Sequence, residues 1–377
     1  MRSRRSKVFR AAGFIVLGLV LLLVVATALY MRQPQFGMAP AGEHLARLQR
    51  SPHFVEGRFA NVHETPDLTE GYSMAGITWR QFVDPAAHRT PIDTIPSVKT
   101  DLMSLPPDSN VLIWFGHSSY YMQIDGKRFL VDPIFSGNAS PVPGTVPSFN
   151  GTDIYTAADF PPIDALFISH DHYDHVDHET LLALRTKIRR VICGLGVGAH
   201  LVHWGYAPER ITETDWNERV ELDSGFVVHT APARHFSGRT FERNNTLWQS
   251  YVLCTPTMKI YIGGDSGYDT HFAEIGAAHG PIDLAILDNG QYDAAWKYIH
   301  TMPEEVLRAG RDLRAMRIFP VHSSKFVLAN HPWDEPLSRI KELNEGYGFP
   351  LVTPMIGEPV YLDRPAQEFS RWWVGLK

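Results

Sequence analysis

The stretch Ser169-His170-Asp171-His172-Tyr173-Asp174-His175 directly follows an apolar run, residues 165–168, that is typical of a buried β-strand. Alternate side chains of an extended segment face the same side, so the imidazoles of His170 and His172 are expected to converge on one cation. Asp174 and His175 are displaced from that pair, where the chain turns toward a helix. They are therefore suited to a second cation close to the first.

This stretch is better explained by metal binding than by a solvated polar loop. Residues 170–178 hold four histidines and three aspartates, and burying them without a metal would be costly. Asp177 is expected to be the N-cap of the helix that follows. The motif therefore predicts at least one metal site at the end of a strand.

Three more candidate ligands occur in the same setting, just past the end of an apolar run. They are His235, Asp265 and His322, which follow the expected strands at residues 226–229, 259–262 and 317–320. The ends of such strands meet along one edge of a sheet, where α/β active sites are usually found. Asp265 has two oxygens with which to bridge a pair of metals. The glycines at positions 263, 264 and 267 are expected to let the backbone come close to those metals.

Composition narrows the kind of protein and the kind of metal site. The only cysteines are Cys193 and Cys254, so no thiolate zinc site of the CxxC type exists, and both are expected to be buried free thiols. Residues 1–31 carry five basic and no acidic side chains, which leaves 30 basic and 41 acidic ones, a net charge of −11, for the remainder. Such a body is poorly suited to nucleic acid, whose phosphates are bound by Lys and Arg.

The N-terminus has the pattern of a membrane segment. Residues 11–30 form an uncharged, mostly apolar run behind the five basic residues. As a helix it would be about 30 Å long, enough to cross a bilayer core. The positive-inside rule predicts a single-pass anchor with the rest of the chain on the non-cytoplasmic side, periplasmic or extracellular. The alternative is a signal peptide cleaved after Ala26-Thr27-Ala28, which would leave a secreted or periplasmic protein.

Three regions are expected along the chain: a cytoplasmic stub with the membrane segment (residues 1–31), an irregular arm (32–108) and an α/β hydrolase domain (109–377). Asp125-Gly126 is typical of a hairpin turn. Strands are expected at residues 111–115, 120–124, 129–131, 165–168, 191–193, 226–229, 250–253, 259–262, 284–287 and 317–320, and helices at 42–49, 180–188, 199–204 and 303–313.

The pattern H-x-H-x-D-H, followed by a histidine, an aspartate and a last histidine, resembles the metallo-β-lactamase superfamily. Six further stretches resemble the N-acylphosphatidylethanolamine phospholipase D family within it: WFGHSS (114–119), FLVDPIFS (129–136), GGDSGY (263–268), YIHTMPEE (298–305), VHSSKF (321–326) and the less specific IGEP (356–359). The resemblance covers residues 51–362. It implies an αββα four-layer sandwich with a dinuclear site, usually zinc, between two sheets.

The resemblance also implies a role for each candidate ligand. His170, His172 and His235 would hold one Zn²⁺, Asp174, His175 and His322 the other, and Asp265 would bridge both. The same ligand types accept iron or manganese. The implied reaction is hydrolysis of a phosphodiester by attack of hydroxide on phosphorus, with Asp174 and Asp265 essential to it.

Three further residues have roles suggested by the resemblance or by position. Asp132 resembles an aspartate that orients the ligand loop, although it also suits a plain turn before Pro133. His300 matches a family histidine and is expected to donate a proton or contact phosphate, the alternative being a loop residue that caps the following helix. His117, in the Gly-His-Ser-Ser turn, is expected to lie behind the ligands.

The first functional hypothesis is therefore a membrane-anchored phosphodiesterase that cleaves N-acylphosphatidylethanolamine-type phospholipids. A lactonase, or another small-molecule hydrolase such as a β-lactamase, is the alternative on the same fold. A non-catalytic envelope protein is the alternative of another class, and the presence of all seven ligand positions argues against it. The sequence leaves open whether the chain forms a homo-oligomer.

Overall fold

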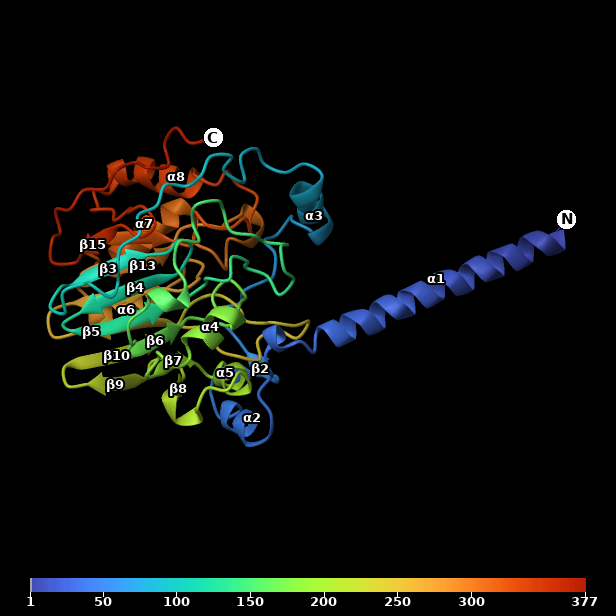
Figure 1. The fold of residues 1–377 in the computed structure, drawn as a ribbon, viewed down its shortest axis with the longest axis horizontal. Coiled ribbons are helices and arrows are strands. Elements are labelled where there is room, and N and C mark those ends of the chain that lie inside the picture. The colour runs from blue at the N-terminus through green and yellow to red at the C-terminus, as the bar shows by residue number, and fades with distance from the viewer. Residues whose placement is uncertain (1) are drawn as a thin grey trace.

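The computed structural model describes the backbone of residues 2–377 and the side chains from Ala11 onward. The chain begins with a long helix, α1 (Arg2–Tyr30), that projects from the body (Figure 1). Its segment Ala11–Tyr30 is long and apolar enough to cross a membrane, and none of it is buried against the body. The helix therefore has the properties of an anchor or a signal sequence, as its composition predicted. Tyr30 makes the junction with the body, because its hydroxyl donates to the carbonyl of Pro141 at 2.9 Å.

Two β-sheets form the centre of the body. The seven-stranded sheet has the order β15-β3-β4-β5-β6-β7-β8, with β3 (Val111–Trp114), β4 (Tyr120–Ile124), β5 (Lys127–Val131), β6 (Ala165–Ile168), β7 (Val191–Gly194), β8 (Ile211–Thr214) and β15 (Pro359–Tyr361). The six-stranded sheet has the order β14-β13-β12-β11-β10-β9, with β9 (Arg219–Asp223), β10 (Phe226–Ala231), β11 (Ser250–Cys254), β12 (Lys259–Ile262), β13 (Leu284–Asp288) and β14 (Ile318–Val321).

Apolar side chains on both faces of these strands make the layers. In β6, Ala165 and Phe167 point into the core between the two sheets, whereas Leu166 and Ile168 point to the outer face. This alternation follows from the pleat, and a strand that is covered on both faces is apolar throughout. The core between the sheets is closed from the other side by residues of the six-stranded sheet, including Leu253 and Ile286.

Helices cover the two outer faces and complete the four-layer αββα sandwich. Leu181 of α4 (His178–Leu184) and Leu201 of α5 (Gly198–His203) pack on the seven-stranded sheet. The other sheet is covered by α6 (His271–His279), α7 (Pro303–Asp312) and α8 (Glu335–Leu343). Five short 3₁₀ helices connect the elements within the described residues: η1 (Pro34–Phe36), η2 (Ala157–Asp159), η3 (Pro208–Arg210), η4 (Ala294–Trp296) and η5 (Asn344–Gly346). The predicted fold class is confirmed.

Most expected elements are present, and the differences have local causes. Asp125 and Gly126 both have positive φ, as the tight hairpin between β4 and β5 requires. Helix α4 ends at Leu184 rather than residue 188, because Ile188 forms a bridge with Ile163. The sequence did not predict β8, β9, β15, α6 or α8. Strands β8 and β9 lie at or near sheet edges with half-polar sequences, which weakens their apolar pattern.

Residues 32–108 hold more regular structure than expected. The expected helix at 42–49 is present as α2 (Gly42–Leu48), and the segment also contains the pair β1 (Phe54–Val55) and β2 (Arg58–Phe59) and a helix, α3 (Met74–Phe82). Leu48 and Phe59 are fully buried in a small core beneath the arm, together with Trp248 of the body. The segment is therefore packed against the body rather than loosely attached.

The two cysteines are free thiols, since no disulfide occurs in the part of the chain described. Cys193 is buried in β7, whereas Cys254, at the end of β11, is half-buried. The expectation that both are buried is therefore right for Cys193 and only partly right for Cys254.

The core between the sheets can be tested with two leucines of different burial. Leu253→Ala removes a fully buried side chain from β11 and should lower the free energy of unfolding by about 2–5 kcal/mol. Leu182→Ala, on the exposed face of α4, is the matched control and should cost well under about 1 kcal/mol. Urea unfolding of the full chain in detergent measures both. Equal losses would contradict the described core.

Candidate metal centre

Three histidines from two loops form the first group of candidate ligands. His170 and His172 follow β6, and His235 follows β10. Nε2 of His170 lies 2.9 Å from Nδ1 of His172, which lies 3.2 Å from Nε2 of His235. Two nitrogen ligands of a tetrahedral zinc ion are about 3.3 Å apart, since each bond is about 2.0–2.1 Å long. The three nitrogens are thus gathered at the spacing that one cation needs.

In two of these rings the second nitrogen is held by the protein. His235 Nδ1 lies 2.9 Å from the carbonyl oxygen of Ile299, and His170 Nδ1 lies 3.0 Å from the hydroxyl of Ser169. A hydrogen bond at one ring nitrogen sets the tautomer and leaves the other nitrogen free to bind a metal. The rings are therefore already oriented as ligands.

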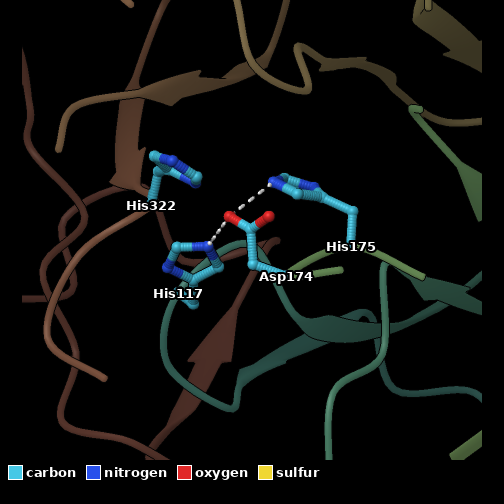
Figure 2. A group of neighbouring side chains, drawn as sticks. All are labelled: His117, Asp174, His175 and His322. Carbon is cyan, nitrogen blue, oxygen red and sulfur yellow. Dashed lines mark hydrogen bonds and ion pairs between the residues drawn. The ribbon is translucent and has the colours of Figure 1, made fainter. Parts of the chain in front are cut away.

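The second group lies beside the first and comes from three segments (Figure 2). Asp174 and His175 lie in the loop after β6, His322 follows β14, and His117 lies in the turn between β3 and β4. One ligand atom of each lies within 4.8 Å of the others. The geometry therefore brings together the Asp174, His175 and His322 set that the sequence predicted, and adds His117 to it.

His117 was expected to lie behind the ligands, and the structure places it in direct contact with one of them. Its Nε2 is 2.8 Å from Oδ2 of Asp174, while its Nδ1 has no hydrogen-bond partner among the described residues. The turn is held by two backbone bonds to the other sheet, from His117 N to the Ser323 carbonyl and from His322 N to the His117 carbonyl. This pairing holds His117 against the loop that carries His322. The sequence did not predict the contact, because the two residues are far apart in the chain.

Asp132 orients the loop that carries most candidate ligands. It is fully buried at the end of β5, and its carboxylate accepts from the Ser169 amide at 2.9 Å and contacts His175 Nδ1 at 2.8 Å. His175 Nε2 is thereby turned toward Asp265, 3.1 Å away. The positioning role suggested by resemblance thus has a geometric basis, and Asp132 is more than a turn residue.

Asp265 lies between the two groups. Its Oδ2 is 3.7 Å from His170 Nε2 and 3.1 Å from His175 Nε2, and its Oδ1 is 3.1 Å from His322 Nδ1. His175 Nε2 and Asp265 Oδ1 are buried and lack a hydrogen-bond partner in the described chain. Buried polar atoms are normally satisfied, so these orphaned atoms fit a pair of bound cations. A cluster of imidazole and carboxylate donors suits zinc, iron or manganese.

Burial favours the metal-binding form of four of the candidate imidazoles. Desolvation lowers the pKa of four imidazoles and so favours the neutral ring: His170, His172, His235 and His322. For Asp265, burial acts to raise the pKa, but the His175 and His322 imidazoles outweigh it and hold the pKa well below its usual range. The carboxylate is therefore ionised and the four rings are neutral.

The structure places His300 at the site and adds a partner that the sequence did not predict. His300 Nδ1 is 2.8 Å from Oδ2 of Asp288, the buried last residue of β13. Burial acts to lower the pKa of His300, but the Asp288 carboxylate outweighs it and raises that pKa. Asp288 had the same signal as the predicted ligands, an acid at the end of an apolar strand. The expected strand stopped one residue short of it.

Asp171, between His170 and His172, supports the ligand loop and lies outside the cluster of candidate metal ligands. Asp171 points away from the histidines and accepts from the Gly238 amide at 2.7 Å and the Thr246 hydroxyl at 2.9 Å. Its carboxylate also contacts Nε2 of His200, a histidine packed inside the body. Alternate residues of an extended segment face opposite sides, which is why Asp171 is excluded from the cluster.

A buried arginine, Arg239, also supports the ligand loop. Arg239 donates to the backbone carbonyls of Asp171 at 2.7 Å and Val176 at 2.9 Å, on either side of the ligand loop. The same guanidinium donates to the carbonyl of Gln35, in the segment that follows α1. Arg239 therefore ties the ligand loop to the segment that joins it to the N-terminal helix, which the sequence did not suggest.

The arm also supports the centre. Asn61 donates to the carbonyl of His235 at 2.8 Å and accepts from its amide at 3.2 Å. The glycines near Asp265 are also needed for packing, because protein atoms occupy the space that a side chain would take. A Cβ at Gly267 would lie 2.0 Å from the Tyr298 carbonyl oxygen, and one at Gly264, whose φ is +61°, would lie 2.6 Å from Ser169 Cβ.

A cavity of about 670 Å³ opens over the cluster. His172, Asp174, His235, Asp265, His300 and His322 lie at its polar end. Its walls are largely apolar and come from both the arm and the body: Leu68, Met74, Phe236, Trp296, Ile299 and Leu328. Arg243, also in the lining, is paired with Asp67 of the arm at 2.8 Å. A molecule that reaches the cluster must therefore pass apolar surface.

Comparisons with known proteins agree with this fold and site. The family described as "Beta-lactamase superfamily domain" matches residues 127–323. An "uncharacterized protein" of Mycobacterium tuberculosis is 38% identical over 340 residues, 89% of this chain and 91% of its own. N-acyl-phosphatidylethanolamine-hydrolyzing phospholipase D 1 of Caenorhabditis elegans is 28% identical over 249 residues, 61% of this chain and 68% of its own. The structure of Igni18, a metallo hydrolase of Ignicoccus hospitalis, shares the fold with a TM-score of 0.52 at 19% identity, over 67% of this chain and 97% of its own.

The chain therefore belongs to the metallo-β-lactamase superfamily, as its motifs predicted. It is a metal-dependent hydrolase of that fold, with a His/Asp cluster able to bind metal. Within the superfamily, the predicted resemblance to the N-acylphosphatidylethanolamine phospholipase D family is confirmed.

The ligand scheme can be tested by metal analysis. Asp174→Ala removes a carboxylate from the second group and should lose at least one metal per chain and nearly all turnover. Asp108→Ala, on an exposed turn, is the matched control and should change neither. Elemental analysis of the purified full chain gives the metal content. An Asp174→Ala protein with unchanged metal content would overturn the scheme.

The contacts of Arg239 with the ligand loop give a second prediction. Arg239→Gln should lower metal affinity about 10–100-fold, because supports behind a ligand loop act on affinity to that extent. Arg185→Gln is the control, since that side chain donates to the Trp204 carbonyl, away from the loop. Competition with a chelator measures affinity, and circular dichroism shows whether each variant folds. A folded Arg239→Gln protein with unchanged affinity would remove Arg239 from this role.

Proposed function

We propose that this chain is a phosphodiesterase that hydrolyses N-acylphosphatidylethanolamine-type phospholipids to a phosphatidic acid and an N-acylethanolamine. The observation that carries the proposal is the apolar cavity above the His/Asp cluster. Long acyl chains need apolar walls, whereas a small polar substrate would leave these walls wet. Relatives in C. elegans and Saccharomyces cerevisiae whose names give this activity add support.

The candidate ligands divide the work at the cluster. His170, His172 and His235 would hold one metal, Asp174, His175 and His322 the other, and Asp265 would bridge them; we propose zinc, because the donors are nitrogen and carboxylate oxygen. Bound there, the metals supply Lewis acidity toward the phosphoryl oxygens and activate water near neutral pH. Water oxygen bonds to phosphorus, and the bond from phosphorus to the ethanolamine oxygen breaks.

The leaving oxygen needs a proton, and we propose that His300 supplies it. Asp288 holds His300 Nδ1, so Nε2 is the nitrogen left to act, and the ring lies in the cavity lining beside the cluster. Asp288 stabilises the protonated ring from behind and acts as a positioning residue. Such general acid catalysis contributes about 10²–10⁴-fold to a rate.

The proposed location is the membrane. Helix α1 would anchor the chain, with the catalytic body on the non-cytoplasmic side, as the basic residues before it favour. An anchored body places the cavity near lipid headgroups. Cleavage of the helix as a signal sequence would instead release the body.

The proposal is tested on liposomes that contain N-acylphosphatidylethanolamine. The zinc-loaded full chain in detergent should release N-acylethanolamine and phosphatidic acid, as read by mass spectrometry. Asp174→Ala should abolish the release, whereas His300→Gln should lower kcat about 10²–10⁴-fold with metal content unchanged. No release from a chain that carries both metals would overturn the lipid assignment. Turnover of a lactone by that chain would assign a lactonase instead.

A further inference from the structure

Helix α3 carries an outward face that nothing in the described chain covers. None of its residues is buried, and four apolar side chains at or next to it are 58–80% exposed: Met74, Trp79, Phe82 and Val83. At 100° per residue these four lie on one half of the helix. Isolated apolar side chains on a surface are common, but such a cluster marks a contact site.

The opposite face of α3 is fastened to the body. Arg80 makes a bidentate pair with Asp293 at 3.3 Å, and Ile77, three residues earlier on the same side, is half-buried. Asp293 caps η4, which carries Trp296 of the cavity wall. The helix is therefore held in one orientation, with its apolar side directed away from the protein.

A second exposed apolar side chain, Phe241, lies in a loop that borders the cavity. Phe241, 84% exposed, is in the loop between Arg239, which binds the Gln35 carbonyl after α1, and Arg243, which lines the cavity. Met74 of α3 lines the same cavity. Helix α3, through Met74, and the loop that carries Phe241, through Arg243, therefore both border the cavity.

Helix α3 lies at the end of the body from which the N-terminal helix projects (Figure 1), and the loop that carries Phe241 is tied through Arg239 to Gln35, just after that helix. Tyr30 contacts the body directly, so no linker separates the body from a membrane that contains Ala11–Tyr30. A bilayer around that segment would therefore begin close to this end of the molecule.

We propose that α3 and Phe241 form an interfacial docking surface that inserts into the lipid bilayer and opens the cavity onto it. The proposal rests on the membrane location in the proposed function and names the surface by which substrate enters. Trp and Phe on one side of a short amphipathic helix are typical of such contacts. The nearby arginines Arg80 and Arg243 are already paired with Asp293 and Asp67, so docking depends on apolar insertion rather than on anionic lipid.

Apolar photolabelling of the full chain tests the docking surface. The protein is reconstituted in phosphatidylcholine vesicles that hold an apolar carbene precursor, and labelled peptides are found by mass spectrometry. Label is expected in Ala11–Tyr30, as the internal standard, and in residues 72–83. Trp79→Gln with Phe82→Gln should remove label from the second segment alone. The matched control is Met316→Gln, an exposed apolar residue that precedes β14, at the opposite end of that strand from His322.

Kinetics on two substrates distinguish membrane docking from a purely structural role of α3, because a structural defect would lower the turnover of both substrates. The α3 double variant should raise KM for vesicle substrate about tenfold while leaving turnover of soluble bis(p-nitrophenyl) phosphate unchanged. Equal losses on both substrates would overturn the proposal. The proposal would also be overturned if α1 were labelled while residues 72–83 carried no label. This includes the case in which crosslinks show a second copy of the chain on this face. Labelling requires no turnover, so a labelled chain that cleaves no phospholipid would refute the proposed function and keep the docking surface.

Discussion

The structure depends on a concentration of buried imidazoles and carboxylates at one point between two sheets. Ten side chains from several loops and strand ends meet there, and three of their polar atoms lack a partner in the described chain. Such a cluster is costly to bury without cations, since each unpaired polar group loses its hydration. The apolar sandwich supplies the energy that holds it, and the cations that it is built to bind would relieve the cost. Stability and chemistry are therefore coupled at the same place.

The loops of this centre are held from outside the two sheets. Arg239 joins the ligand loop to the segment after α1, and Asn61 of the arm holds the backbone of His235 on both sides. The arm also supplies Leu68 and Met74 to the cavity wall. The N-terminal third is therefore part of the site, and a catalytic unit that begins at residue 109 would lack these contacts. These contacts join the N-terminal helix, the cavity and the candidate metal centre in one unit.

Much of the fold and the site could be predicted, because many strands and the first pair of candidate ligands follow from patterns of a few neighbouring residues. The apolar runs 120–124, 165–168 and 259–262 coincide with β4, β6 and β12 to the residue. The spacing of His170 and His172 reports a strand end directly, since the pleat fixes which side chains share a face. Elements with half-polar sequence were missed, among them β8, β9 and α3, because partial burial leaves a weak pattern.

The sequence by itself determined the strands, the metal-binding motif and the membrane-length helix, because each follows from neighbours within a few residues. Only the tertiary structure decided the place of His117 within the cluster, the Asp288–His300 pair and the roles of Arg239 and Asn61. It also decided that Met74 of α3 and Arg243, in the loop that carries Phe241, line the same cavity. These contacts join residues far apart in the chain, and their pairing depends on how the two sheets and the arm pack, which local pattern does not encode.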